Sequence, residues 1–458
     1  MFADARFGHV HGVVSEAVKS RSALKDRYRI TRALDTLLIN RVLGIPLFIF
    51  FLWVMFQATF SLGQMPMDWI DQGVTALGES VAAALPDGLF KDLMVEGIIA
   101  GVGGTIVFLP NIVILFFFMA LFSETGYLAR AAFLMDQLMH HFGLHGKALI
   151  PLVMGFGCNV PAVMATRTIE SERARLITIL INPFMLCAAR LPVFILFAGA
   201  FFAEHAGAMV FAMYMISIVG AMMAAVVLSR LFFKEKDEAF VMELPPYRIP
   251  TLRAVFIHMW DKAMGFLRKV AGIILAGSII IWFLQTFPQN PEWSRDYAQE
   301  TAQIQMQAAT PERDAALMKL RNEQSQEQLS KSYLGQIAHT VAPVFEPLTF
   351  NWKDTVAILT GFVAKEVVVA SYAVLYSQDG ESTAESLSLR QALASAMTTT
   401  TAFAFMVFAL FYSPCLGSIA VIKREAGGWR WAAFSVAFSL SVAYTLAFLV
   451  VQIGGMLT

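Results

Sequence analysis

Long apolar runs separated by short polar or basic stretches dominate this chain. An apolar run of about 20 residues is long enough to cross a bilayer as a helix. We expect complete spans at residues 42–63, 98–122, 176–202, 208–233, 271–287 and 431–453. Only helices and closed barrels satisfy their backbone in lipid, so the pattern predicts an all-α polytopic membrane protein.

Polar and amphipathic stretches stand between these runs. Residues 1–41 are rich in Lys and Arg and predict a cytoplasmic flank, whereas the acidic residues 64–97 predict an outer loop. Residues 127–141 and 251–270 are amphipathic and predict helices along the membrane surface. The Gln- and Glu-rich residues 288–351 predict an extramembrane helical arm.

Composition places the chain in the same class. Hydrophobic residues make up 57% of the 458 residues and charged residues 15%, with a mean hydropathy of +0.62. The formal net charge is zero and the basic residues form no continuous patch, which argues against a nucleic-acid partner. No Gly-x-x-x-x-Gly-Lys-[Ser/Thr] phosphate loop occurs, so we expect a membrane permease without a nucleotide site rather than an enzyme.

One apolar segment, residues 147–166, is interrupted by glycines and prolines. Gly155, Gly157 and Pro161 surround Cys158 and break the helical pattern there. A full crossing would place the arginines that follow outside, so we interpret the segment as re-entrant from the cytoplasm. Non-helical backbone survives in lipid only where protein or a water-lined cavity satisfies it, so the break indicates a transport site.

The chain also contains an internal repeat. Sliding the sequence along itself superimposes Gly155-Phe156 on Gly361-Phe362 and, at a looser offset, Cys187 on Cys415. Duplicated halves with interrupted helices are typical of transporters whose site lies between the repeats. Charge counting makes the repeats inverted, with the second re-entrant segment starting from outside. Chance alignment of apolar sequence is the alternative interpretation.

Three charged residues lie deep in these segments. Lys365 and Glu366 interrupt an apolar stretch, where a charge needs a partner or a cavity. Glu366 is therefore a candidate cation ligand and Lys365 a candidate gating or packing residue, with fixed ion pairs to other helices as the structural alternative. We expect Arg190 to pack helices or to gate the path.

Cys158 and Cys187 lie in consecutive segments, each beside a helix break. Free cysteine is usually a small buried hydrophobe, and that interpretation holds for each one alone. Thiolates with an amide oxygen such as that of Asn159 suit a borderline-soft divalent ion like Fe(II) better than Ca(II) or Mg(II). The pattern does not choose iron over zinc, manganese or copper.

Several motifs together carry a family resemblance. In the first half these are residues 126–133, 143–147, 155–161 and 181–192, and in the second half residues 361–369 and 413–415. They resemble the two Gate motifs in the membrane domain of the bacterial ferrous iron transporter FeoB. The resemblance runs from about residue 3 to the C terminus.

The resemblance implies Fe(II) transport across the bacterial inner membrane by a multi-pass permease with a cytoplasmic N terminus. It names Cys158, Cys187, Cys415 and Glu366 as candidate iron-path residues. Members of the family usually begin with a GTP-binding domain that this chain lacks, so we expect such a domain in cis or in trans. A small cytoplasmic accessory protein and a homo-oligomer are compatible with the resemblance.

We expect six regions along the chain: a cytoplasmic flank at 1–41, the first span and an outer acidic loop at 42–97, the first Gate repeat at 98–233, an amphipathic helix and span at 234–287, the polar arm at 288–351, and the second Gate repeat with a C-terminal span at 352–458. Two other functions stay open. One is a Gate-type carrier of a nucleoside or other organic solute, and the other is a non-transporting membrane partner of a soluble GTPase.

Overall fold

The computed structural model is helical throughout the part of the chain that it describes. That part comprises residues 31, 34–40, 42–233, 247–248, 250–289, 293–306, 311–376 and 386–457, and within it there is no strand. The all-α fold class predicted from the sequence is thus confirmed. The predicted cytoplasmic flank at 1–41 lies almost entirely outside the described residues.

The first half of the chain contains long outer helices and short inner ones, in the order α3 Gly44–Ala84, α4 Leu89–Asp92, the π-helix η1 Leu93–Ile99, α5 Ala100–Ile106, α6 Leu109–Glu124, α7 Tyr127–His141, η2 Gly146–Ala148, α8 Leu149–Gly157, α9 Asn159–Ala165, η3 Thr166–Thr168, α10 Glu172–Ile181, η4 Asn182–Phe184, η5 Ala188–Arg190, α11 Leu191–Phe201, η6 Ala203–His205 and α12 Ala206–Leu231.

The second half adds another long helix, the arm and a second set of short helices, in the order α13 Leu252–Thr286, α14 Tyr297–Gln305, α15 Pro311–Lys331, α16 Tyr333–Phe345, η7 Glu346–Leu348, α17 Trp352–Val363, α18 Val367–Tyr376, α19 Leu387–Ala396, α20 Thr399–Phe411, α21 Leu416–Glu425 and α22 Trp429–Leu457.

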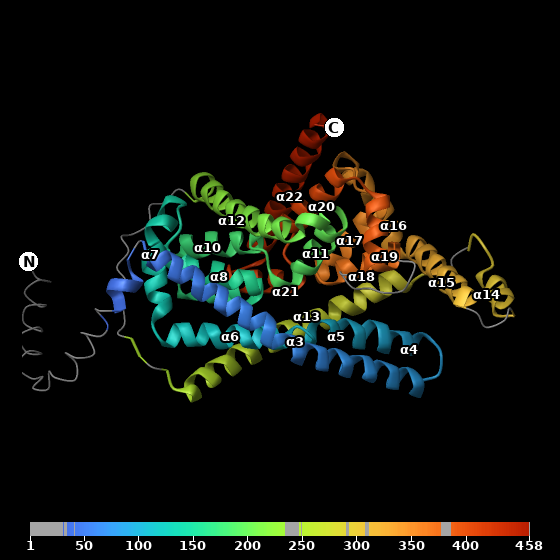
Figure 1. Cartoon of the computed structure of the whole chain (residues 1–458), viewed down its shortest axis with the longest axis horizontal. Helices are drawn as coiled ribbons and strands as arrows, with labels where there is room; N and C mark the ends of the chain where they lie inside the picture. Colours follow the sequence, from blue (N-terminus) through green and yellow to red (C-terminus); the bar gives the residue numbers. More distant parts are fainter. Residues whose placement is uncertain are drawn as a thin grey trace, which may run out of the picture.

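Seven helical segments of the described chain are long and apolar enough to cross a membrane. The two most deeply buried of them, Glu172–Phe201 and Thr399–Glu425, are also broken in the middle. The long helices α3, α6 and α13 run alongside one another on one side of the molecule, and the shorter helices gather next to them (Figure 1). The broken helices therefore form the centre, and the continuous ones surround it.

The predicted outer loop at residues 64–97 is wrong over most of its length. Helix α3 continues through Pro66 to Ala84, and only residues 85–88 separate it from α4. The helix continues because its apolar face still has partners: Val74 lies against Gly103 of α5, and Gly78 lies near Val95 of η1. Asp68, Asp71 and Glu79 of α3 are exposed, so they do not interrupt the helix.

The prediction of a surface helix at residues 251–270 and a separate span at 271–287 is also wrong. Both belong to one continuous helix, α13. Val255, Ala263 and Phe266 are buried on its first half, and the helix packs on α6, α5 and η1. The amphipathic half therefore has a protein surface to cover and continues directly into the apolar half.

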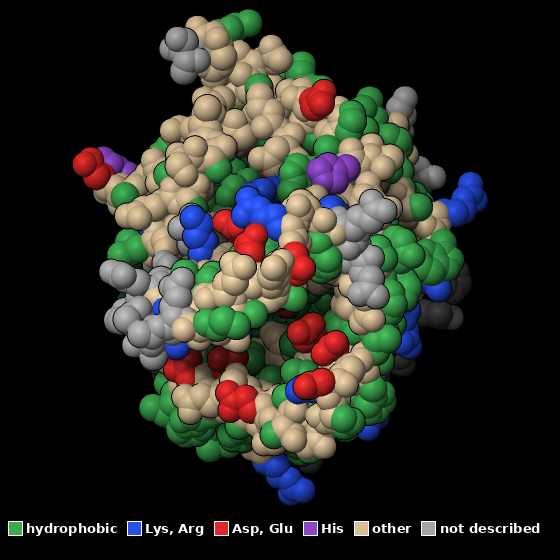
Figure 2. All heavy atoms as spheres, turned by 90° about the vertical axis from the view of Figure 1, so that its right-hand side faces the viewer, with side chains coloured by type: hydrophobic (Ala, Val, Ile, Leu, Met, Phe, Trp, Pro, Cys, Tyr) green, Lys and Arg blue, Asp and Glu red, His purple; other side chains and the backbone are tan. Residues whose placement is uncertain are grey.

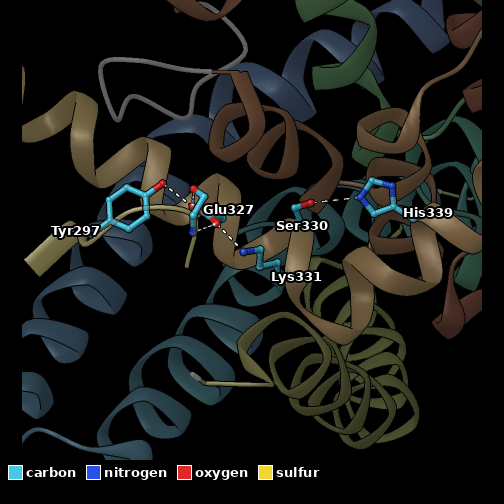
Figure 3. A network of polar contacts seen from close by, with 6 residues as sticks. Tyr297, Glu327, Ser330, Lys331 and His339 are labelled. Atoms are coloured by element: carbon cyan, nitrogen blue, oxygen red, sulfur yellow. Dashed lines mark hydrogen bonds and ion pairs between the residues drawn. The ribbon is translucent and has the colours of Figure 1, made fainter. Parts of the chain in front are cut away.

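The polar residues 288–351 form the helices of the arm, α14, α15 and α16. Glu327 of α15 joins the arm together: its carboxylate accepts 2.7 Å hydrogen bonds from Tyr297 Oη and Ser294 Oγ and pairs with Lys331 Nζ at 2.7 Å (Figure 3). His339 of α16 stacks on Trp352, with ring centroids 4.7 Å apart. The arm is thus tied to the start of α17.

Acid should loosen the arm through Glu327. Hydrogen bonds from Lys331, Tyr297 and Ser294 lower the pKa of this carboxyl from 4.5 to about 2. A lowered pKa means that the contribution to stability is complete above pH 4.5 and is lost as the pH falls toward 2. Hydrogen exchange in α14 and α15 should therefore accelerate across that window, and Glu327→Gln should remove most of the pH dependence.

Glu323→Gln is the matched control, because Glu323 lies on the same helix and pairs with the exposed Arg295 at 3.3 Å. Exposed pairs contribute little, so this variant should retain the acid response. An identical response in the Glu327→Gln protein and the unmodified protein would contradict the role given to Glu327.

Candidate functional site

The first broken segment is a helical hairpin with Cys158 at its tip. Helices α8 and α9 pack against each other, and Cys158 between them is extended, with φ −155° and ψ 129°. An ion pair of 2.7 Å between Lys147 and Glu170 joins the two ends of the hairpin. Both helices are too short to cross a bilayer, and the chain returns to the side from which it started.

A second hairpin has the same construction. Helices α17 and α18 lie side by side, and Ala364 at the tip is extended, with φ −145° and ψ 129°. Tyr372 Oη donates to Asp354 Oδ1 at 2.8 Å across the hairpin, and the hydroxyls of Thr360 and Ser371 lie 2.9 Å apart nearer the tip. The two tips therefore share one backbone geometry at positions that the sequence repeat superimposes closely.

The hairpins approach the centre from opposite ends of the molecule. Arg167, at the base of the first, donates to Glu425 at the end of α21 at 2.6 Å. Thr349, at the base of the second, lies 2.8 Å from Thr401 at the start of α20. Since α20 and α21 are the two halves of one broken helix, the bases lie at its two ends and the tips point toward its break.

Each broken helix has a cysteine at its break. Cys187 precedes η5 and α11 with φ −85° and ψ 159°, and Cys415 precedes α21 with φ −63° and ψ 159°. Both residues are N-caps of the helix that follows. The two thiols therefore occupy equivalent positions in the two halves, each at the start of a helix.

Arg190 satisfies much of the backbone freed by these breaks. The side chain is 2% exposed, and its guanidinium donates to Pro183 O at 2.9 Å, Leu410 O at 2.6 Å and Tyr412 O at 3.2 Å. Pro183 belongs to the first broken helix, and Leu410 and Tyr412 lie at the break of the second. Arg190 therefore joins the two halves of the protein through their unpaired carbonyls.

Ser217 of α12 completes the break in the first half. Its hydroxyl accepts a 2.9 Å hydrogen bond from Leu186 N and donates to Phe184 O at 3.0 Å. Sequence analysis missed this residue, because a serine in an apolar helix has no pattern that distinguishes it from a packing residue. Its position opposite the break is visible only in the fold.

The three thiols come together from three different elements. Cys158, Cys187 and Cys415 each lie within electrostatic range of the other two, and Glu366 lies within range of Cys158. Cys415 Sγ is 3.2 Å from Ser418 Oγ. No group of three or more His, Cys, Asp or Glu in the described residues is placed to hold a metal ion. The fold thus gathers the candidate ligands without closing a coordination shell around an ion.

Asn159 holds the tip of the first hairpin in place. With its amide nitrogen assigned to face acceptors, this side chain donates to Gly155 O, Asn182 Oδ1 and Asn182 O, each at 3.2 Å. Asn182 in turn donates to Pro151 O at 3.1 Å. Asn159 and Asn182 therefore link the hairpin to the first broken helix, and only the oxygen of Asn159 is left for an ion.

The glycines and the proline beside Cys158 allow close packing. A Cβ atom at Gly155 would approach Met185 Cβ to 2.9 Å, and one at Gly157 would collide with Leu115. Pro161 lies in the first turn of α9, where the missing N–H donor costs nothing. These residues let the hairpin tip pack closely against its neighbours. The contacts correspond to the packing role that was one of the two roles predicted for them, gating or packing.

Lys365 is buried beside the aromatic ring of Tyr412. The lysine is 3% exposed, and its ammonium nitrogen lies 3.2 Å from the ring centroid. In the described structure this nitrogen has no hydrogen-bond partner. Sequence analysis missed Tyr412, although it directly precedes the Ser413-Pro414-Cys415 motif of the second break.

A cavity of about 790 Å³ reaches the tip of the second hairpin. Its walls come from η1, α5, α13, α15 and the hairpin itself, and its lining includes Glu96, Ala364, Glu366 and the glutamines Gln285, Gln289, Gln324 and Gln328. The end of the molecule that carries α4 and α15 is hollowed, and Asp and Glu side chains surround the hollow (Figure 2). The predicted site residue Glu366 thus lines a cavity of mixed polar and apolar character that also contains a second carboxylate, Glu96.

Seven potential spans in the described residues, two of which are broken in the middle, and two short helical hairpins define a polytopic membrane protein. A family model named Gate, described as "Nucleoside recognition", matches residues 105–201 and 267–429. A second model, described as "Ferrous iron transport protein B C terminus", matches residues 210–262. No solved structure matches the chain.

Relatives that are named as Fe(2+) transporters agree with these family models. The chain is 46% identical, over 98% of its length, to a Porphyromonas gingivalis protein named "Fe(2+) transport protein A/Fe(2+) transporter FeoB fusion protein". It is 40% identical over 94% of its length to a Campylobacter jejuni Fe(2+) transporter FeoB, and 37% identical over 99% to one from Methanocaldococcus jannaschii. The chain belongs to the FeoB family, and it spans 54%, 67% and 63% of the lengths of these relatives.

Removing the guanidinium of Arg190 should destabilise the whole fold. Arg190→Met leaves three buried carbonyls without their charged donor, and each hydrogen bond from a charged donor contributes about 1.5–3 kcal/mol. We expect the free energy of unfolding in detergent to fall by about 3 kcal/mol or more, with a lower melting temperature. The melting temperature of the Arg190→Lys protein should lie between those of the unmodified and Arg190→Met proteins, since an ammonium cannot reproduce the planar, forked donors of the guanidinium.

Arg230→Met is the control for loss of a positive charge, because Arg230 is exposed at the end of α12. A surface change of this kind alters stability by about 0.5 kcal/mol or less. Equal melting temperatures for the Arg190→Met and Arg230→Met proteins would exclude the joining role of Arg190.

Proposed function

We propose that this chain is the permease part of a FeoB-type system and carries Fe(II) across the bacterial inner membrane. The observation that carries the proposal is the convergence of Cys158, Cys187 and Cys415 at helix breaks of both halves. Three thiols within electrostatic range of one another suit a borderline-soft divalent ion.

The cavity supplies a route to these thiols. Glu96 and Glu366 present carboxylates to a space large enough for a hydrated ion, and the glutamines around them offer neutral oxygens. An ion that loses its water at Glu366 reaches the break where Cys415 stands. Cys187 and Cys415 each stand directly before a helix that restarts after a break. The proposed roles are thus capture by oxygen, followed by coordination by sulfur.

We infer that a GTP-binding domain or protein, in cis or in trans, controls the permease. The relatives are longer than this chain, and one of them combines FeoB with an Fe(2+) transport protein A in a single polypeptide. That fusion supports a small accessory protein as a further partner. A homo-oligomer is also compatible with the exposed apolar faces of the outer helices, which lipid covers equally well.

We infer an inverted repeat with the Arg167 end of the molecule in the cytoplasm. Arg167, Lys423 and Arg424 lie at the base of the first hairpin, where α21 ends. Helix α4, which follows Asp87 and contains Asp92, lies with the arm helices α14 and α15 at the other end (Figure 1), where Asp and Glu side chains surround the hollow (Figure 2). An excess of Lys and Arg marks the cytoplasmic side.

Labelling of engineered cysteines tests this orientation. In a background with the three native cysteines replaced by serine, Asp87→Cys and Glu170→Cys place thiols at opposite ends, where the native side chains are 97% and 82% exposed. A membrane-impermeant maleimide added outside intact spheroplasts should label only the Asp87→Cys protein. Labelling of only the Glu170→Cys protein would reverse the orientation.

Fe(II) uptake tests the function itself. The full chain is reconstituted in liposomes under anaerobic, reducing conditions, and Fe(II) entry is followed with a trapped metal-sensitive dye. We expect the Cys158→Ser/Cys187→Ser protein to lose about tenfold or more of the initial rate, because serine hydroxyls coordinate a soft ion poorly. Undiminished uptake by this double variant would rule out the thiols as ligands.

Met119→Leu is the matched control, since it removes a buried sulfur on α6 outside the breaks and should leave uptake unchanged. The Gate family model is described as "Nucleoside recognition", so a nucleoside carrier is the second candidate function. That candidate predicts thermal stabilisation by nucleosides and none by Fe(II), with both responses independent of the cysteines.

A further inference from the structure

The Lys365 ammonium is a buried cation held by a single soft contact. Its nitrogen lies 3.2 Å from the centroid of the Tyr412 ring and has no hydrogen-bond partner in the described structure. A buried ammonium normally uses its three donors, because leaving them unpaired away from water is costly. No hydrogen bond in the described structure therefore fixes this side chain in its position on the Tyr412 ring.

The surroundings of Lys365 are those of the proposed ion site. Burial and the like charge of Arg190 oppose a charge on its amine, whereas Cys415, Cys187 and Glu366 lie within electrostatic range and favour it. Arg190 is bound to three carbonyls, whereas Lys365 is bound to none. Of the two buried cations, Lys365 is therefore the one that can move.

We propose that the Lys365 ammonium is a resident cation of the thiol site, which a divalent metal ion must displace from the Tyr412 ring in order to bind. The inference rests on the proposed function and adds a determinant of ion choice to it. A monovalent ion brings no more charge than the ammonium that it would replace. A divalent ion with affinity for sulfur gains more from the thiols and Glu366 than the ammonium loses.

The fold provides a place for the displaced side chain. Ala364 and Glu366, the two neighbours of Lys365 in the chain, both line the cavity of about 790 Å³. The tip of the hairpin is non-helical there, and a lysine side chain has a flexible four-carbon stem. Rotation about this stem can carry the ammonium from the Tyr412 ring into this cavity, where two carboxylates and four glutamines can accept its hydrogen bonds.

Cobalt binding to the purified full chain tests the proposal without a transport assay. Co(II) alone is the probe, and its thiolate charge-transfer absorption reports coordination by cysteine. Lys365→Met keeps the length of the side chain and removes its charge, so we expect Co(II) to bind about tenfold more tightly, or better, than to the unmodified chain. Lys365→Arg keeps the charge and should bind no more tightly than the unmodified chain.

Lys353→Met is the matched control. Lys353 lies in α17 of the same hairpin, also over a tyrosine ring, with its nitrogen 4.2 Å from the centroid of Tyr376, but it donates to Leu375 O at the base of the hairpin. This variant should leave Co(II) affinity unchanged. Unchanged or weaker Co(II) binding by the Lys365→Met protein would overturn the proposal.

Two variants of Tyr412 give an independent test that leaves Lys365 in place. Tyr412 Oη has no hydrogen-bond partner in the described structure, so Tyr412→Phe keeps the ring that holds the ammonium and should not change Co(II) affinity. Tyr412→Leu removes the ring and should raise the affinity. Equal affinities for these two variants would contradict the displacement.

The melting temperature without metal separates displacement from a structural role. Since the ammonium has no hydrogen bond to lose, Lys365→Met should melt at or above the temperature of the unmodified chain. A lower melting temperature with unchanged Co(II) binding would make Lys365 structural. If the unmodified chain shows no cysteine-dependent Co(II) binding, the proposed function fails as well, whereas normal binding with no effect of Lys365→Met overturns this inference alone.

Discussion

Backbone that leaves the helical pattern inside a membrane must find hydrogen-bond partners within the protein, and the interior of this molecule is organised by that requirement. Four helical segments are interrupted near its centre, two at hairpin tips and two in broken helices. Arg190 takes up the free carbonyls of both broken helices, and Ser217 completes the first of them. The side chains that satisfy the interrupted backbone thus also fix the two halves relative to each other. Cys187 and Cys415 lie where the broken helices restart.

A cation path with two buried positive charges at its centre needs an explanation in physical terms. The Arg190 guanidinium is stabilised by hydrogen bonds to backbone carbonyls, which give it a structural role. Lys365 has only the face of an aromatic ring, and it lies among the thiols and the carboxylate that would bind an ion. A site that contains its own weakly held cation resists occupation by monovalent ions and admits an ion only in exchange for that charge. Selectivity and the barrier to leak then come from the same side chain.

The sequence predicted the spans and the first broken segment because apolar length, glycine, proline and basic flanks are local signals. The same reasoning failed where tertiary contacts override them: residues 64–84 continue α3 because Val74 and Gly78 find partners on η1 and α5, and the acidic residues simply face outward. The partners of Arg190 were beyond prediction, since a backbone carbonyl has no sequence signature. Tyr412 was missed for a related reason, because its ring matters only through Lys365, which lies at the tip of a separate hairpin.

The central claim is that sulfur atoms from both halves of the protein coordinate the ion at the helix breaks. X-ray absorption at the iron K edge of the Fe(II)-loaded full chain tests it most directly, because the scattering distinguishes sulfur from oxygen and nitrogen neighbours. We predict at least two sulfur ligands in the unmodified chain, with fewer when Cys158, Cys187 or Cys415 is replaced by serine. An iron coordinated by oxygen and nitrogen alone, with a spectrum that these substitutions do not change, would contradict the claim.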